Sequence, residues 1–244
     1  MNSIKLQKYF SDCAIMSRRA AEEEIEKGRV TVNGEKATLG LRIDPDTDVI
    51  IYNGKRILPQ NSEKTYIILN KPRGILTTLS DEKGRKTVVS LLSGLSNRVY
   101  PVGRLDMDSD GLLILTDDGE LTNRLTHPRH QIPKIYHVTV AGKPTPEQLT
   151  LLRSPLVIDG YKIQPVKTTV LKNEHSSTVL EMTLFEGRNR QIRKMCHAAE
   201  LKISRLSRVA IGKIGIGSLE VGKWRYLTAE EIDYLKKESA QNNV

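Results

Sequence analysis

Short apolar runs and alternating apolar and polar residues follow one another along most of the chain after residue 65. Alternation with a period of two predicts half-buried strands, and short apolar runs predict fully buried strands. We predict strands at 66–70, 112–115, 134–140, 157–170, 178–185 and 209–221. Helical periodicity and capping signals predict helices at 87–92, 119–125, 146–153 and 228–237, and one that starts at residue 190. Because strands and helices do not strictly alternate, this part should form an α+β domain with a mixed, largely antiparallel sheet flanked by helices.

The first 60 residues show a different pattern, with two short helical segments followed by two short strands. We predict the helices at 4–10 and 18–27 and the strands at 30–32 and 49–52. Ser17 can cap the second helix and Gly28 can end it. Each strand is followed by an Asn-Gly pair, the sequence signal of a tight hairpin. The segment therefore predicts a small module in which a helical hairpin packs on a small β-sheet.

A polar stretch that contains Pro59, at 58–64, separates this module from the rest and predicts a linker. We therefore expect a domain at 1–60, a larger domain at 61–238 and a frayed tail at 239–244.

Charge and composition narrow the class of partner. The chain has 244 residues and a net charge of +9. Residues 1–62 hold 10 basic and 9 acidic groups, whereas residues 63–244 hold 28 and 20, so the positive excess lies in the larger domain. Such an excess predicts a polyanionic partner, most simply a nucleic acid. Only two cysteines, Cys13 and Cys196, are present, which argues against a zinc site and a disulfide framework.

The stretch at 99–119 places three aspartates, Asp106, Asp108 and Asp110, at alternate positions before Gly111 and a buried apolar run. One interpretation is a calcium loop, because D-x-D-x-D-G is the start of that motif and Asp117 lies at its last position. Its flanks carry proline, glycine and a strand-like run where a calcium-binding EF-hand needs helices. A second interpretation is a loop that presents a catalytic aspartate, and a third is a solvated acidic turn.

A second charged segment follows the strand at 178–185. From Arg190 onward, apolar residues at 192, 195, 196 and 199 fall on one helical face, and Arg190, Arg193, Lys194 and His197 fall on the other. Residues 188–208 hold seven lysines or arginines and one acid, Glu200. Solvated helix faces usually mix charges of both signs, so we interpret this helix as a phosphate-facing surface.

Several motifs together resemble the RNA pseudouridine synthases of the RsuA/RluB type. These motifs are N-K-P-x-G at 70–74, G-R-L-D at 103–106, G-L-L-x-x-T-x-D-G at 111–119 and E-G-R-N-R-Q-I-R at 186–193. The string S-R-R-A-A-E-E-E-I-E-K-G-R-V-T-V-N-G at 17–34 resembles the S4 RNA-binding domain.

This resemblance implies a role for each matching residue. It implies that Asp106 is the catalytic carboxylate, that Arg193 pairs with it and that Tyr136 packs against the target base. It also implies that Arg104 occupies the space of a flipped base. We expect RNA contacts from Lys71, Arg188, Arg190 and Lys194. We also expect Arg18 and Arg19 to contact RNA. Positive charge in the first turn of a helix opposes the helix dipole, so these two arginines do not stabilise the helix, and phosphate binding would explain their presence.

The function expected from this resemblance is the isomerisation of uridine to pseudouridine in ribosomal RNA, with the large-subunit RNA as the favoured target. The alternatives are a synthase that acts on small-subunit RNA and a non-catalytic RNA-binding assembly factor. The reaction needs no cofactor and no metal. We expect a monomer that acts on ribosomal RNA or a pre-ribosomal particle. We expect it in the cytoplasm, because the sequence shows neither a signal peptide nor a transmembrane segment.

Overall fold

The computed structural model describes residues 3–58, 63–127 and 132–241. The chain forms two compact units, one over residues 1–64 and 117–119 and the other over residues 65–116 and 120–244. Most of the predicted linker, at 59–62, lies outside the described residues. None of the helices in the described ranges is long and apolar enough to span a bilayer.

The first unit is a helical hairpin on a small sheet, as the sequence predicts. Its described elements are β1 (Ile4–Lys5), α1 (Leu6–Asp12), α2 (Arg18–Glu26), β2 (Val30–Val32), β3 (Glu35–Lys36), β4 (Arg42–Ile43), β5 (Ile50–Tyr52) and β6 (Lys55–Arg56). The strands pair in the order β3-β2-β5-β6, and β1 pairs with β4. The hydroxyl of Ser17 accepts a hydrogen bond from the Ala20 amide at 3.1 Å, so the predicted cap is confirmed. Asn33 and Asn53 have φ of 53° and 48°, as tight Asn-Gly hairpins require.

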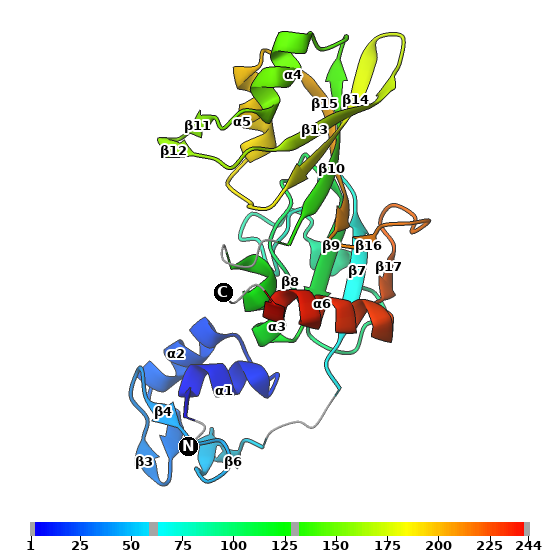
Figure 1. Ribbon diagram of the computed structural model, residues 1–244. Coiled ribbons are helices and arrows are strands. Elements are labelled where there is room, and N and C mark those ends of the chain that lie inside the picture. The colour runs from blue at the N-terminus through cyan, green and yellow to red at the C-terminus, as the bar shows by residue number, and fades with distance from the viewer. Residues whose placement is uncertain (1–2, 59–62, 128–131, 242–244) are drawn as a thin grey trace. The chain divides into compact units, whose positions relative to one another are not determined.

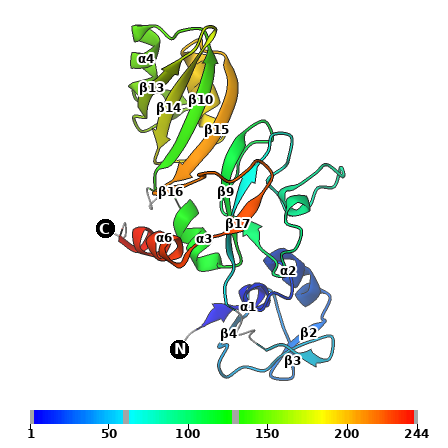
Figure 2. The ribbon, with the colours of Figure 1, turned by 90° about the vertical axis from the view of Figure 1, so that its right-hand side faces the viewer.

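The second unit is built on one long mixed sheet (Figures 1 and 2). Its strands are β7 (Tyr66–Lys71), β8 (Tyr100–Pro101), β9 (Asp110–Thr116), β10 (Lys134–Ala141), β11 (Val157–Ile158), β12 (Tyr161–Lys162), β13 (Lys167–Asn173), β14 (Ser177–Leu184), β15 (Ile203–Ile211), β16 (Ile214–Gly215) and β17 (Trp224–Tyr226). Its helices are the short 3-10 helix η1 (Val88–Leu91), α3 (Gly119–Thr126), α4 (Pro146–Arg153), α5 (Gln191–Ala198) and α6 (Ala229–Gln241). The main strands run in the order β13-β14-β10-β15-β9-β7-β17. Every neighbouring pair in that order is antiparallel except β15 and β9, which confirms the predicted α+β class.

Helices cover the two halves of this sheet separately (Figure 1). Residues from α4 and α5 share one apolar core with β10, β14 and β15, in which Met195 and Cys196 are fully buried. Residues from α3 and α6 share another core with β7 and β9. A third core lies among other residues of β7 and β9, where η1 and the segment before residue 106 pack. The two halves of the sheet meet at the short parallel pairing of β15 with β9.

At that junction the two backbones come unusually close. The parallel pairing consists of Ser207 with Asp110 and Arg208 with Gly111. Gly111 has φ of 109°, and a Cβ atom at this position would lie 2.2 Å from the carbonyl oxygen of Arg208. No side chain fits there, so glycine is required for the two strands to pair.

Three of the predicted elements differ from the structure. The strand predicted at 157–170 is instead a small hairpin, β11 and β12, followed by β13, because Asp159 and Gly160 both have positive φ and form a turn. The strand predicted at 209–221 begins earlier, at Ile203, and ends at Ile211 before the turn at Gly212. Helix α6 continues through the buried Ser239 to Gln241, past the start of the expected tail.

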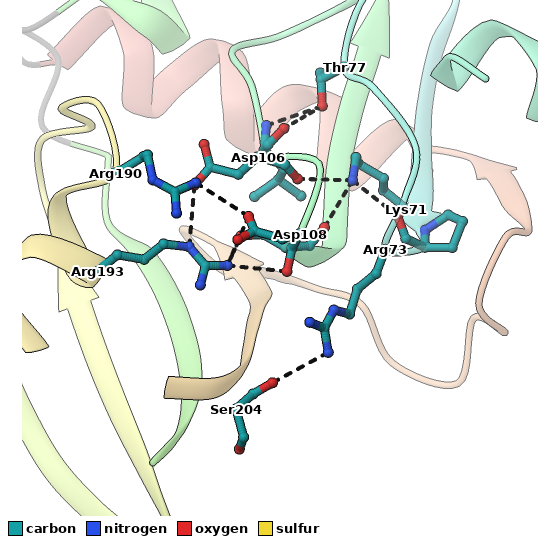
Figure 3. A network of polar contacts seen from close by, with 11 residues as sticks. Lys71, Arg73, Thr77, Asp106, Asp108, Arg190, Arg193 and Ser204 are labelled. Atoms are coloured by element: carbon teal, nitrogen blue, oxygen red, sulfur yellow. Dashed lines mark hydrogen bonds and ion pairs between the residues drawn. The ribbon is translucent and has the colours of Figure 1, made fainter. Parts of the chain in front are cut away.

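The acidic loop that precedes β9 is held by Lys71, the last residue of β7, on the side away from Arg190 and Arg193 (Figure 3). The Lys71 ammonium donates hydrogen bonds to the carbonyl oxygens of Pro72, Asp106 and Ser109 at 3.0, 3.1 and 2.9 Å. The side chain is fully buried. Burial lowers the pKa of Lys71 to about 8, against the attraction of Asp110, Asp106 and Asp108.

The prediction that Lys71 binds RNA is therefore wrong. A lysine in an N-K-P-x-G turn suggested an exposed cation. In the structure the strand ends inside the protein, and the Lys71 ammonium donates its hydrogen bonds to three backbone carbonyl oxygens. Lys71 supports the loop that carries Asp106.

Replacing Lys71 with methionine should lower the free energy of unfolding by about 2 kcal/mol or more, because three carbonyl oxygens lose their shared donor. The gain from no longer burying a charge offsets only part of this loss. Urea unfolding measures the change. The control is Arg73→Met, an exposed cation two residues away with a single long contact to Ser204, which should change stability by less than about 0.5 kcal/mol. Equal effects of the two variants would contradict the anchoring role.

Candidate active site

Asp106 lies at the centre of a charged cluster formed by two distant parts of the second unit. Arg190 and Arg193 approach it from one side, and Lys71 lies on the other side (Figure 3). Arg190 Nη1 lies 3.4 Å and Arg193 Nε lies 3.6 Å from the same oxygen, Asp106 Oδ2. The Asp106 side chain remains 30% exposed, so a substrate can reach it. Two guanidinium groups thus lie beside one carboxylate oxygen.

Hydrogen bonds also fix the backbone on both sides of Asp106. Thr77 Oγ1 donates to the Leu105 carbonyl oxygen at 2.7 Å and accepts from the Leu105 amide at 3.3 Å. The Gly74 amide donates to the carbonyl oxygen of Met107 at 2.7 Å. With the Lys71 contacts, these bonds fix the residues on both sides of Asp106 and thus preorganise its carboxylate.

The predicted proximity of Arg193 and Asp106 is present, but Arg193 makes its shorter contacts elsewhere. Arg193 Nη2 lies 3.0 Å from Asp108 Oδ1 and donates to the Asp108 carbonyl oxygen and to Ser109 Oγ, both at 3.1 Å. The Nε atom facing Asp106 is buried, and it has no hydrogen-bond acceptor within the described part of the chain. Asp108, which the sequence suggested was a plain loop acid, is thus the main anchor of Arg193.

The calcium-loop interpretation is wrong. Asp106 and Asp108 face arginines, and Asp110 is buried in an ion pair with Arg205 at 3.0 Å. The segment after Asp110 is strand β9, so the last positions of a calcium loop are paired in the sheet.

A cavity of about 390 Å³ opens beside Asp106. Its lining includes Arg104, Tyr136, Arg188 and Arg190, which the sequence singled out. Tyr136 is half-buried on β10 and packs against the cores of both halves of the sheet. Arg104 is exposed and has no hydrogen bond or ion pair among the described residues. The Asp106 carboxylate, the Tyr136 ring and these three arginines thus line one cavity.

The other predicted RNA contacts lie near this cavity or in the first unit. Arg188 stacks on Tyr161, with its Cζ 3.1 Å from the ring centroid, and Lys194 pairs with Asp159. Helix α5 ends at Ala198, Lys202 lies just before β15, and Arg205 and Arg208 belong to β15, so the basic stretch is not one helix as expected. In the first unit, Arg18 and Arg19 are exposed in the first turn of α2.

Two cavity residues were not found from the sequence, Lys134 and Arg208. Lys134 lies two residues before Tyr136, so strand alternation already placed both on one face of β10. Arg208 lay in a stretch interpreted as helical, and only the pairing of β15 with β10 brings it opposite Tyr136.

Comparison with known proteins shows which families this chain resembles. The RNA pseudouridylate synthase family matches residues 65–198, and the S4 domain family matches residues 16–49. An uncharacterized RNA pseudouridine synthase of Aquifex aeolicus is 41% identical over 97% of this chain and 95% of its own. The ribosomal large subunit pseudouridine synthase B of Bacillus subtilis is 37% identical over 95% of both chains. The dual-specificity RNA pseudouridine synthase RluF of Escherichia coli K12 is 38% identical over 95% of this chain and 78% of its own.

A solved structure agrees with these sequences. The crystal structure of a pseudouridylate synthase superposes with a TM-score of 0.68 at 30% identity and covers 95% of this chain and 99% of its own. The agreement therefore extends over both the S4-like unit and the larger unit. The chain belongs to the RNA pseudouridine synthases of the RsuA/RluB type, isomerases that carry an S4 RNA-binding domain before the catalytic domain.

Proposed function

We propose that this enzyme converts uridine to pseudouridine in ribosomal RNA, and that its target lies in the large-subunit RNA. The observation that carries the chemistry is the Asp106 carboxylate, which is partly exposed in the cavity and is held by two arginines and the Lys71-anchored loop. The ribosomal target is supported by the Bacillus subtilis relative, whose name assigns it to the large ribosomal subunit and which matches this chain over 95% of its length.

Each residue of the cavity has a role in this proposal. Asp106 acts as the nucleophile or charge stabiliser at the sugar or the base, because it lines the cavity beside two arginines. Arg193 orients the Asp106 carboxylate. Tyr136 stacks against the uracil, and Arg104 fills the gap that the extruded base leaves in the RNA. The reaction needs no cofactor and no metal, because the same atoms are rearranged without a redox change.

The remaining cations bind the RNA backbone. Arg188, Arg190 and Lys194 surround or adjoin the cavity and face the phosphates on either side of the target. Residues 1–60 form the S4 domain, residues 61–238 form the catalytic domain, and the protein works as a monomer on ribosomal RNA or a pre-ribosomal particle. A ribosomal substrate places this activity in the cytoplasm.

The target can be tested by mapping pseudouridine in ribosomal RNA from cells with and without the gene. We expect one or a few positions of the large-subunit RNA to lose pseudouridine in the deletion strain and to regain it when the gene is restored. A loss confined to small-subunit RNA would support the alternative target. No change in either RNA would exclude a ribosomal substrate.

The S4 domain should contribute affinity through Arg18 and Arg19. Replacing both with alanine removes two phosphate contacts, so the slope of log affinity against log salt should become shallower by about 1.5. Anisotropy of labelled large-subunit transcript at several salt concentrations measures this slope. Tritium release from saturating RNA should stay within about twofold, because these residues only bind.

The first unit itself offers a matched control for that experiment. Lys27 and Arg29 lie at the other end of α2, and both pair with Glu24, at 3.0 and 2.9 Å. Replacing both Lys27 and Arg29 with alanine should change the salt slope by less than half of the change expected for the Arg18 and Arg19 double variant. Equal slopes for the two double variants would contradict a specific role for Arg18 and Arg19.

A further inference from the structure

Two cations on the buried side of the cavity, Lys134 and Arg208, are not explained by the roles proposed above. Both line the cavity with Asp106 and Tyr136. Arg208 lies opposite Tyr136 in the pairing of β15 with β10, and Lys134 lies two residues before Tyr136. These registers put all three side chains on the same face of the sheet. We call Lys134 and Arg208 the cation pair.

The cation pair lacks a negative partner among the described residues. Arg208 is 5% exposed, and its Nε donates to the carbonyl oxygen of Leu112 at 2.8 Å. Its Nη2 is buried and has no acceptor within the described ranges. Lys134 Nζ likewise has no side-chain hydrogen bond or ion pair in the described part of the chain. By contrast, the buried Lys71 ammonium meets three carbonyl oxygens, and Arg193 lies within 3.0 Å of a carboxylate oxygen.

Such an arrangement costs stability unless a ligand completes it. Burial and, to a lesser extent, the charge of Arg208 lower the pKa of Lys134 to about 8. Two positive charges without a negative partner repel each other and lose hydration when they are buried. Proteins keep such groups where a bound molecule supplies electron-rich oxygens or negative charge.

We infer that Lys134 and Arg208 form a subsite for the carbonyl oxygens of the target uracil, and that they stabilise the negative charge of the base after it leaves the ribose. This inference rests on the proposed role of the cavity in holding the target uridine. Lys134 would then be a catalytic residue, since it touches the reacting base.

The charge balance of the reaction explains why such a subsite is useful. When the bond between N1 of uracil and C1′ of ribose breaks, its electron pair stays with the base. The base is then an anion whose charge is shared by N1 and the two carbonyl oxygens. After rotation, C5 forms the new bond to C1′, the C5 proton leaves and N1 takes up a proton. Cations aimed at the carbonyl oxygens lower the energy of the detached state and also keep the free base inside the cavity.

The neighbours of the cation pair favour a base over a phosphate. Ile114, Leu184 and Ile211 line the same cavity, and apolar side chains suit the faces of a flat ring. A phosphate of the RNA backbone is strongly hydrated and belongs near the exposed cations. Arg104 is exposed and the Arg190 side chain is 44% exposed, so these residues are better placed for that contact.

The test compares the rate of the chemical step with RNA affinity. Total RNA from cells that lack the gene, labelled with tritium at C5 of uracil, is mixed with excess full-length enzyme. For Lys134→Met, which keeps the length of the side chain but removes its charge, we expect the single-turnover rate of tritium release to fall about 100-fold or more. The enzyme concentration that half-saturates the RNA should change less than twofold. Lys143→Met, an exposed lysine after the same strand, should match the wild type in both measurements.

A second variant separates a chemical role from a structural one. Lys134→Ala leaves space, so added ethylammonium should restore tritium release in proportion to its concentration. The same salt should not restore Lys134→Met, whose side chain fills that space. Rescue of the alanine variant supports the subsite even if the methionine variant folds poorly.

Three results would overturn the inference. One is tritium release by Lys134→Met at the wild-type rate. Another is weaker RNA binding with an unchanged rate at saturation, which indicates a phosphate contact. The third is a folded Lys134→Ala that ethylammonium does not rescue. The proposed ribosomal target is judged separately, by sequencing which RNA lost its label. Release from another class of RNA would contradict that target and leave the comparison of Lys134 variants intact.

Discussion

The loop that carries Asp106 depends on a buried ammonium group. Lys71 ends a fully buried strand and joins three carbonyl oxygens, two of which belong to Asp106 and Ser109. Without this shared donor, the loop would place unpaired carbonyl groups in the interior. The attraction of three aspartates offsets part of the cost of burying the charge. The backbone of the loop is therefore fixed by contacts within the protein, and Asp106 is in position before a substrate binds.

The two halves of the sheet bring opposite charges together. One half supplies the aspartates through the loop before β9, and the other supplies Arg190 and Arg193 through α5 and the residue before it. The halves meet where Gly111 touches the backbone of Arg208, a contact that only glycine allows. The position of the carboxylate relative to its arginines is thus set by backbone packing, which is stiffer than contacts between long side chains.

Much of this could be predicted from the sequence because it depends on local signals. The Ser17 cap, the Asn-Gly hairpins and the apolar face of α5 follow from short-range patterns, and the motif around Asp106 pointed to the cavity. The burial of Lys71 and the contact of Arg193 with Asp108 could not be predicted, because both depend on strands that are distant in sequence. Arg208 was missed for the same reason: its charge suggested a surface, whereas its pairing with Tyr136 buries it.

The central claim is that Asp106, and no other acid of the loop, carries the chemistry. It is tested most directly by tritium release from RNA labelled at C5 of uracil, with Asp106→Asn compared with Asp108→Asn. Both substitutions keep the size of the side chain and remove one charge beside the same arginines. We predict that Asp106→Asn lowers release by about 1,000-fold or more with unchanged RNA affinity, whereas Asp108→Asn retains at least about a tenth of the activity. Release by Asp106→Asn near the wild-type rate would contradict the account.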